Sequence, residues 1–274
     1  MTNSIIYFIL AGLIQGLAEF LPISSSGHLV VFHELTGFDV SASLAFDVIL
    51  HLGTLAALII FFWNDLWRYL LVFFQSLVKP DFKNNKDQFL AWLILLTTIP
   101  AAFFGLVFEK ELELIFRQSY LVAIVMIGFG VVLYLADKYS TSKKEIEQLT
   151  WFDSLVIGFA QVLSLVPGVS RSGITIIAGR TQKLKRQAAA RFSFLISTPI
   201  ILGAGLKQLY DVFTENALGD VSFFSLGIGF LVSAVTGYFC IKYFLKFLEN
   251  HSLKIFALYR IIFGLIVLLV LYFR

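Results

Sequence analysis

The chain has 274 residues, of which 58% are hydrophobic and only 14% are charged, and its mean hydropathy is +0.86. Such a composition excludes a soluble domain and indicates a polytopic membrane protein. The formal net charge of +3 gives no sign of nucleic-acid binding, so no nucleic acid is expected as a partner. The single cysteine, Cys240, excludes an intramolecular disulfide and a cysteine-based metal site.

The first apolar region, residues 5–31, is interrupted near its middle by Pro22, by serines at 24–26 and by Gly27. Crossing the hydrocarbon takes about 20 helical residues, and neither half of this region is long enough. Non-helical backbone at membrane depth is tolerated only where it is buried in protein or lines a cavity. The pattern therefore predicts a re-entrant helix pair.

Six uninterrupted apolar stretches are long enough to cross the membrane, and a second interrupted region separates the first three from the last three. The interrupted region is 154–179, broken around Pro167, and it predicts a second re-entrant pair. The predicted spans are 44–63, 89–108, 119–136, 188–206, 221–241 and 255–273. The expected fold is all-α, a polytopic membrane protein with six transmembrane helices and two re-entrant helix pairs.

The two interrupted regions resemble each other. Gly12, Gln15, Ser24, Ser26 and Gly27 recur at a constant offset of 146 as Gly158, Gln161, Ser170, Ser172 and Gly173. Each half then contains one re-entrant pair and three spans. Since three is an odd number of crossings, the second half must be upside down relative to the first, as in inverted-topology repeats. We expect one membrane domain over 1–274 with repeat halves at about 1–137 and 150–274. The alternative is chance identity between two segments rich in leucine, glycine and serine.

Basic residues divide unevenly between the two sides of this arrangement. One side carries 4 of them, Lys110, Arg117, Lys207 and Arg274. The other side carries 15, namely Arg68, Lys79, Lys83, Lys86, Lys138, Lys143, Lys144, Arg180, Lys183, Lys185, Arg186, Arg191, Lys242, Lys246 and Lys254. The positive-inside rule makes the second side cytoplasmic. Both termini and the first re-entrant pair are therefore expected to face the exterior.

The first interruption contains groups that are costly to bury in a membrane, and such groups usually mark a working site. Gln15 and Glu19 are four residues apart, so they share one helix face, where a metal or acid–base role is possible. The alternative for Glu19 is pairing with a distant arginine. The serines suit the N-cap of the following helix, whose free N–H groups form an anion site; ordinary capping is the alternative. His28 could accept a proton from Ser25 or be an ordinary bundle histidine.

In the second interruption, Arg171 lies between Ser170 and Ser172, and a guanidinium binds phosphate oxygens in a bidentate manner. The alternative is an Arg171–Glu19 ion pair, which could hold the empty site together until phosphate displaces it. His51 lies within a span without a motif and has a weaker claim. Arg260, alone in the last span, is interpreted as a partner for a carbonyl or a carboxylate.

The two strings, Gln15-x-x-x-Glu19-Phe-Leu-Pro-Ile-Ser-Ser-Ser-Gly-His28 and Pro167-Gly-Val-Ser-Arg-Ser-Gly-Ile-Thr175, resemble the two signature motifs of bacterial undecaprenyl pyrophosphate phosphatases of the bacitracin-resistance type. The resemblance covers the whole length. It implies hydrolysis of a polyprenyl pyrophosphate lipid in the bacterial cytoplasmic (inner) membrane, at its outer face, with a divalent metal such as Mg²⁺ or Ca²⁺. This activity recycles the lipid carrier for peptidoglycan and confers bacitracin tolerance.

Carried over by motif position, the resemblance implies the roles of the site residues. Catalysis is assigned to Glu19, Ser25, His28 and Arg171, and the metal to Glu19 and Gln15. Pyrophosphate binding is assigned to Arg171, Ser24, Ser26, Gly27, Ser170, Ser172, Gly173 and Thr175. Many members have Glu where this chain has Gln15, and an amide can ligate a metal only through its neutral oxygen. Two questions stay open from the sequence, the nucleophile (Ser25 or a metal-bound water) and the oligomeric state, for which a homodimer is one option. A transporter or flippase of an anionic lipid or phosphate is the alternative function.

Overall fold

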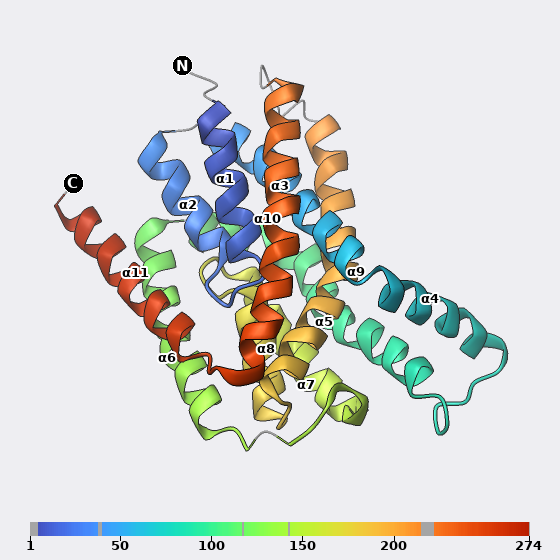
Figure 1. Cartoon of the computed structure of the whole chain (residues 1–274). Helices are drawn as coiled ribbons and strands as arrows, with labels where there is room; N and C mark the ends of the chain where they lie inside the picture. Colours follow the sequence, from blue (N-terminus) through green and yellow to red (C-terminus); the bar gives the residue numbers. More distant parts are fainter. Residues whose placement is uncertain (1–4, 38–39, 117, 142, 215–221, 274) are drawn as a thin grey trace.

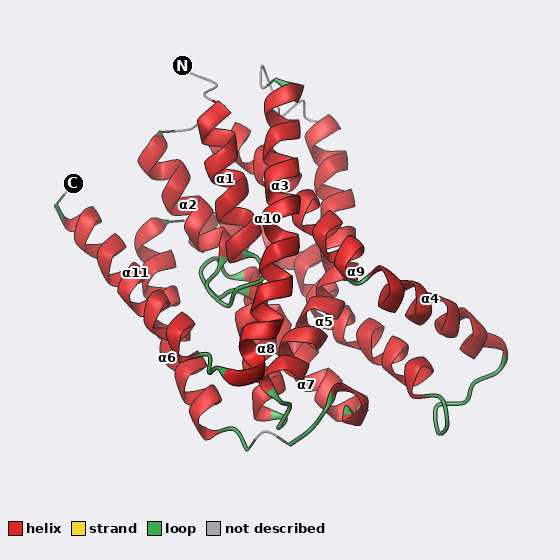
Figure 2. Ribbon diagram, in the orientation of Figure 1, coloured by secondary structure: helices red, strands yellow, loops and turns green. Residues whose placement is uncertain are grey.

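The computed structural model describes residues 5–37, 40–116, 118–141, 143–214 and 222–273, without the side chains of 40–45, 109–114, 116, 212 and 213. Within these ranges the regular structure is helical, apart from one isolated bridge between Lys144 and Leu184 (Figure 2). The elements are α1 Ile5–Ala18, α2 Ser25–Thr36, α3 Val40–Phe61, α4 Trp63–Val78, α5 Lys86–Phe116, α6 Ser119–Tyr139, η1 Ile146–Gln148, α7 Trp151–Val162, η2 Leu163–Leu165, α8 Arg171–Thr181, α9 Arg186–Thr214, α10 Phe223–Asn250 and α11 Lys254–Tyr272.

Five of the described helices are long and apolar enough to cross a membrane, and they lie in α5, α6, α9, α10 and α11. The sixth candidate is a bent pair, in which α3 turns by 80° into α4. All six predicted spans fall on these helices, so the expectation of an all-α, multi-pass membrane protein is confirmed. The sequence analysis did not predict α4, because Asn64, Asp65 and Arg68 interrupt its apolar residues and hide it from a search for spans.

Each interrupted region forms two short helices with a break between them. Figure 1 shows α1 and α2 in one half of the molecule and α7 and α8 in the other, with the breaks meeting near the centre. Ser24 and Ser170 are the N-cap residues of α2 and α8. Both have a φ of 75°, in the left-handed region that is uncommon for serine. Their hydroxyls accept hydrogen bonds from the N–H groups of Gly27 and Gly173, at 3.3 Å and 3.0 Å. This local match supports the repeat, whose inverted arrangement stays a prediction.

Two repeat-related glycines let the short helices approach long ones closely. A Cβ on Gly12 of α1 would lie 2.9 Å from the carbonyl oxygen of Gly229 on α10. A Cβ on Gly158 of α7 would lie 2.8 Å from the carbonyl oxygen of Thr97 on α5. Small residues allow such contacts between membrane helices, which pack by van der Waals attraction. The two re-entrant pairs are thus held against the spanning helices.

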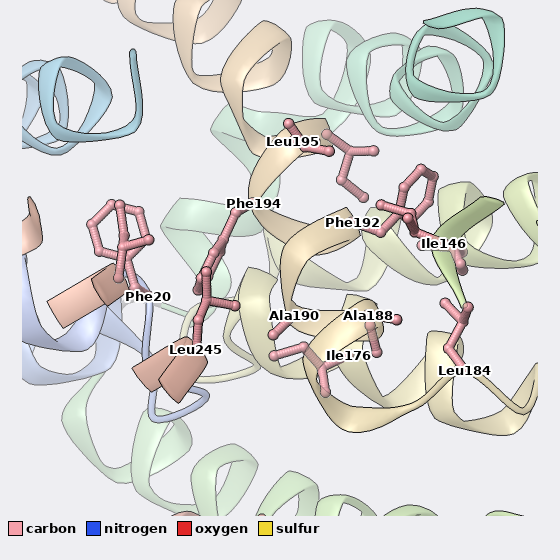
Figure 3. Packing of buried hydrophobic residues seen from close by; sticks show 14 of the residues in the cluster. Phe20, Ile146, Ile176, Leu184, Ala188, Ala190, Phe192, Phe194, Leu195 and Leu245 are labelled. Carbon is pink, nitrogen blue, oxygen red and sulfur yellow. The ribbon is translucent and has the colours of Figure 1, made fainter. Parts of the chain in front are cut away.

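The largest apolar core lies beside the breaks. Phe20, in the first break, packs edge-to-face on Phe194 of α9, with ring centroids 5.4 Å apart. Figure 3 shows Leu245 of α10 beside this pair and the core continuing through α8 and α9 toward Leu184. Aromatic and aliphatic side chains therefore fill the α9 and α10 side of the first break.

Candidate active site

A cavity of about 240 Å³ lies where the two breaks meet. Its polar lining comes from both halves of the chain and consists of Glu19, Ser25, Ser26, His51, Ser164, Ser170, Arg171 and Gln208. The two motif strings, which are far apart in the sequence, therefore contribute to one site. The rest of the lining is largely apolar and is supplied by α5, α9 and η2.

Glu19 is the centre of the polar network. Its side chain is only 4% exposed, and its Oε1 accepts a hydrogen bond from Nη2 of Arg171 in a buried ion pair. Its Oε2 accepts hydrogen bonds from Ser25 Oγ at 2.6 Å and from Gln15 Nε2 at 3.1 Å. The ion pair that the sequence analysis considered as an alternative is thus present. It links the first break to the start of α8 and leaves neither charge alone at membrane depth.

Ser25 is placed for nucleophilic chemistry. It is the first residue of α2, and its hydroxyl donates to a carboxylate oxygen within proton-transfer distance. The preceding turn is held by the Ser24 cap and by a 3.3 Å contact between the hydroxyls of Ser24 and Ser26. The second break has the same feature, since the hydroxyls of Ser170 and Ser172 lie 3.2 Å apart.

The structure does not bring His28 to the cavity. Its Nδ1 bonds to the carbonyl oxygen of Ser24 at 2.7 Å, and its Nε2 bonds to the hydroxyl of Tyr259 at 2.8 Å. The ring also stacks on Phe263 of α11, with centroids 4.3 Å apart. Both ring nitrogens are therefore hydrogen-bonded on the side of the first break that faces α11. There the ring fixes the backbone that precedes Ser25.

His51 of α3 occupies the place beside Glu19 instead. Its Nε2 lies 3.7 Å from Glu19 Oε2, and its Nδ1 bonds to the carbonyl oxygen of Asp47 at 2.7 Å. Because a carbonyl only accepts, Nδ1 donates this hydrogen bond, and Nε2 is the ring nitrogen that faces Glu19 at the cavity. The sequence analysis gave His51 little weight. The signal that could have found it is an ionisable residue inside an apolar span.

Of the other predicted hydroxyl residues, some line the cavity and some bond to neighbouring segments. Ser26 and Ser170 line the cavity. Ser172 donates to the carbonyl oxygen of Leu21 at 3.0 Å, and the hydroxyls of Thr175 and Ser193 are 2.7 Å apart. Ser172 therefore links the second break to the first, and Thr175 joins α8 to α9.

Gly27 and Gly173 are positions of close packing. A Cβ on Gly27 would lie 2.9 Å from Sδ of Met126, and one on Gly173 would lie 3.1 Å from Nη1 of Arg260. Both glycines thus keep side chains of α6 and α11 close to the helix starts. Neither lines the cavity.

Arg260 is fully buried and bonds only to backbone carbonyls in the described part of the chain. Nη1 donates to Pro22 in the first break and to Val169 in the second, at 3.1 Å and 3.0 Å. Nη2 donates to Gly168 at 2.7 Å, and Nε donates to Met126 of α6 at 3.3 Å. Of the two partners that the sequence left open, the structure selects carbonyls. One guanidinium therefore fastens both breaks to each other.

Among the described residues, no group of three or more His, Cys, Asp or Glu side chains could surround a metal ion. The donors available near the cavity are the carboxylate of Glu19 and Oε1 of Gln15, which is buried without a hydrogen-bond partner. This set fits an ion such as Mg²⁺ that is held by one carboxylate and mainly by substrate phosphates. An equally unpaired Oε1 occurs at Gln161, and neither glutamine lines the cavity, so the unpaired oxygen alone does not identify a metal site.

Comparison with known proteins gives a consistent result. The family model described as bacitracin resistance protein BacA matches residues 8–266. A protein of Caldicellulosiruptor bescii named undecaprenyl-diphosphatase is 44% identical over 265 residues, 95% of each chain. Proteins of the same name from Paenarthrobacter aurescens and Aliivibrio salmonicida are 39% and 43% identical, over 97% and 92% of this chain and 96% and 92% of their own lengths. The matched region contains both breaks and every polar residue that lines the cavity.

Proposed function

The chain belongs to the bacitracin resistance protein BacA family, and from this we infer that it is an undecaprenyl-diphosphatase. It is a membrane enzyme that hydrolyses undecaprenyl pyrophosphate to undecaprenyl phosphate and inorganic phosphate. The observation that carries the inference is the contact set of Glu19, which holds the Ser25 hydroxyl on one oxygen and the Arg171 guanidinium on the other. A base, a nucleophile and an anion-binding group thus meet in one cavity.

Binding starts at Arg171. The pyrophosphate carries more charge than the carboxylate, and its oxygens accept two parallel N–H bonds, so it competes with Glu19 for the guanidinium. The N-terminus of α8 and the hydroxyls of Ser26 and Ser170 add further donors to the phosphate. Displacement from Arg171 frees one oxygen of Glu19 and leaves the other on Ser25. Substrate binding thereby releases Glu19 from the ion pair, so that its carboxylate can act as the general base for Ser25.

Phosphoryl transfer then proceeds through Ser25. Its Oγ attacks the terminal phosphorus, its proton passes to Glu19, and the bond from that phosphorus to the bridging oxygen breaks. The bridging oxygen leaves with the prenyl phosphate. A water next attacks the phosphorus of the phosphoserine, and the bond from that phosphorus to Ser25 Oγ breaks. The water gives a proton to Nε2 of His51, which passes it to the departing phosphate, while Glu19 returns its proton to Ser25 Oγ. His28 acts as a positioning residue, because it fixes the carbonyl of Ser24 next to the nucleophile.

A divalent cation such as Mg²⁺ or Ca²⁺, bound through Glu19 and the amide oxygen of Gln15, would neutralise part of the pyrophosphate charge. The competing route is direct attack by water on the phosphorus, with Ser25 only orienting the phosphate. The two routes differ in whether the protein becomes phosphorylated.

We assign the cavity to the outer side of the bacterial inner membrane. The expected cytoplasmic side carries most of the basic residues, in the segments around 138–150, 180–191 and 242–254. On the expected outer side, Arg117 and Arg274 lie outside the described residues, and the side chain of Lys110 is not described. Labelling of single cysteines placed near residue 5 and near residue 146 in intact cells tests this orientation. Sizing of the purified protein in detergent tests the homodimer.

The experiment on function is phosphate release from undecaprenyl pyrophosphate by the purified protein in detergent, where no gradient exists. The wild type should release phosphate, and Arg171→Ala should release none while keeping its fold. Arg191→Ala is the matched control, because Arg191 also pairs with a carboxylate, Asp65, but lies outside the cavity. If the protein is a transporter, neither the wild type nor the variants should release phosphate. Full activity of Arg171→Ala would refute the assignment of this cavity as the active site.

The covalent route is tested with Ser25→Ala. This variant should lose turnover and form no acid-stable phosphoprotein after brief mixing with substrate labelled at the terminal phosphate. Near-normal turnover would eliminate Ser25 as nucleophile and leave attack by water.

A further inference from the structure

A second cavity, of about 260 Å³, lies between α5 and α9, and we refer to it as the α5–α9 cavity. It adjoins the cavity that holds Glu19 and Arg171, because Ala101, Leu165, Ile200 and Ala204 line both. The chemistry changes across this shared wall. The catalytic cavity presents a carboxylate, a guanidinium and hydroxyls, whereas the α5–α9 cavity is apolar apart from Thr98 and Lys207.

Small residues create the space in the α5–α9 cavity. Its lining includes Ala102 and Gly105 on α5 and Gly203 on α9. A Cβ on Gly203 would meet no atom within 4 Å, and one on Gly105 would meet only Leu165 Cδ2, at 3.5 Å. Larger side chains at these positions would therefore fill the cavity without displacing the helices.

The α5–α9 cavity also reaches the surface that faces lipid. Leu106, one of its lining residues, is 71% exposed, and the apolar neighbours Phe103 and Leu206 are exposed as well. In a multi-pass membrane protein such exposed apolar side chains contact acyl chains. A molecule that lay in both cavities would thus have a charged end at Glu19 and Arg171 and an apolar end directed into the bilayer.

We propose that the α5–α9 cavity binds the first isoprene units of the substrate's polyprenyl chain. This inference rests on the proposed function, because it places the chain of the same pyrophosphate that Arg171 binds. The prenyl chain is joined to the charged group by one phosphoester bond. Its first units therefore lie next to the catalytic cavity, and the α5–α9 cavity is the apolar space that shares a wall with it.

A larger apolar groove of about 540 Å³ lies on another face, lined by residues such as Leu21, Phe239, Cys240 and Tyr243. It shares no lining residue with the catalytic cavity. The core pair Phe20 and Phe194 fills the interior beside the first break. Size alone would favour this groove for a long prenyl chain, but the wall shared with the catalytic cavity favours the α5–α9 cavity.

Moving the chain from lipid into the protein gains no hydrophobic free energy, because both surroundings are apolar. The α5–α9 cavity therefore acts through shape and position. It holds the first units so that the bridging oxygen lies opposite the attacking hydroxyl. Filling it should weaken binding of long-chain substrates and leave the chemistry on a short pyrophosphate intact.

The test uses Gly203→Leu, with Gly128→Leu as matched control. A Cβ on Gly128 of α6 also meets no atom within 4 Å, and Gly128 lines neither cavity. In Gly203→Leu we expect the KM for undecaprenyl pyrophosphate to rise at least tenfold, with less than twofold change in phosphate release from isopentenyl pyrophosphate. The control should match wild type on both substrates. An unchanged KM for undecaprenyl pyrophosphate in Gly203→Leu would overturn the proposal.

A second measurement does not depend on turnover or on the folding of that variant. A prenyl pyrophosphate with a photoreactive group on its second isoprene unit is bound to Ser25→Ala and irradiated. Crosslinks should form to 98–106 or 199–207, and crosslinks to 235–247 would place the chain in the other groove and refute the proposal. If the wild type releases no phosphate from either substrate, the proposed function fails, which is a different result from an unchanged KM.

Discussion

Arg260 offers the sharpest test of how the two breaks are held together. It is fully buried, and its guanidinium donates to the carbonyls of Pro22, Val169, Gly168 and Met126. In Arg260→Met the side chain keeps much of its volume, but the carbonyls of Pro22, Gly168 and Val169 in the breaks lose this donor. The carbonyl of Met126 keeps its helical partner inside α6. No water replaces the lost donor, because the site lies inside the protein at membrane depth.

The magnitude follows from the contacts. Each buried carbonyl without a donor costs about 1–3 kcal/mol, so three cost about 3–9 kcal/mol before any relaxation. Removal of a buried charge with no carboxylate partner in the described part of the chain returns several kcal/mol. We expect a net loss of about 2–5 kcal/mol in the free energy of unfolding. Arg260→Lys should fall between wild type and Arg260→Met, because an ammonium keeps the charge without the planar fork.

The assay is thermal unfolding in detergent together with phosphate release below the melting temperature. Arg260→Met should melt earlier and lose turnover, since Glu19 and Arg171 lie on segments that it fastens. Arg191→Met is the control, because the Arg191 side chain is 40% exposed and should cost little. If Arg260→Met melts with the wild type and keeps full turnover, the guanidinium does not hold the breaks and the reasoning is wrong.

Three further predictions concern the site. His51→Phe should lower kcat by about 10²–10⁴ with little change in KM, as expected for loss of a proton acceptor, and wild-type turnover in steady-state assays would rule this role out. Ser170→Ala should cost about 1 kcal/mol in thermal unfolding through the lost helix cap, whereas Ser170→Gly should cost less because glycine tolerates the φ of 75°; equal losses would contradict this. Gln15→Glu would place a second carboxylate beside Glu19, so half-maximal activity should need less Mg²⁺. An unchanged Mg²⁺ titration would exclude Gln15 as a ligand.

The sequence by itself determined the membrane architecture. Length and hydropathy are enough to locate helices that cross the bilayer, because each must supply about 20 apolar residues. Proline, glycine and serine inside the two shorter apolar regions likewise identified both breaks, since such residues end helices locally. The sequence analysis did not predict α4 because its 16 residues include charged side chains in the first turns and do not form an uninterrupted apolar stretch of about 20 residues.

Tertiary packing decided which polar residues share the site. Motif position put His28 beside the nucleophile, but Tyr259 and Phe263 of α11 hold its ring behind the first break. Conversely, α3 brings His51 next to Glu19, although its only sequence signal is that it is ionisable and lies inside an apolar span. A side chain's direction depends on which partners complete its hydrogen bonds, and in a membrane those partners come from helices distant in sequence. The same reason explains Arg260, whose carbonyl partners belong to both breaks and to α6.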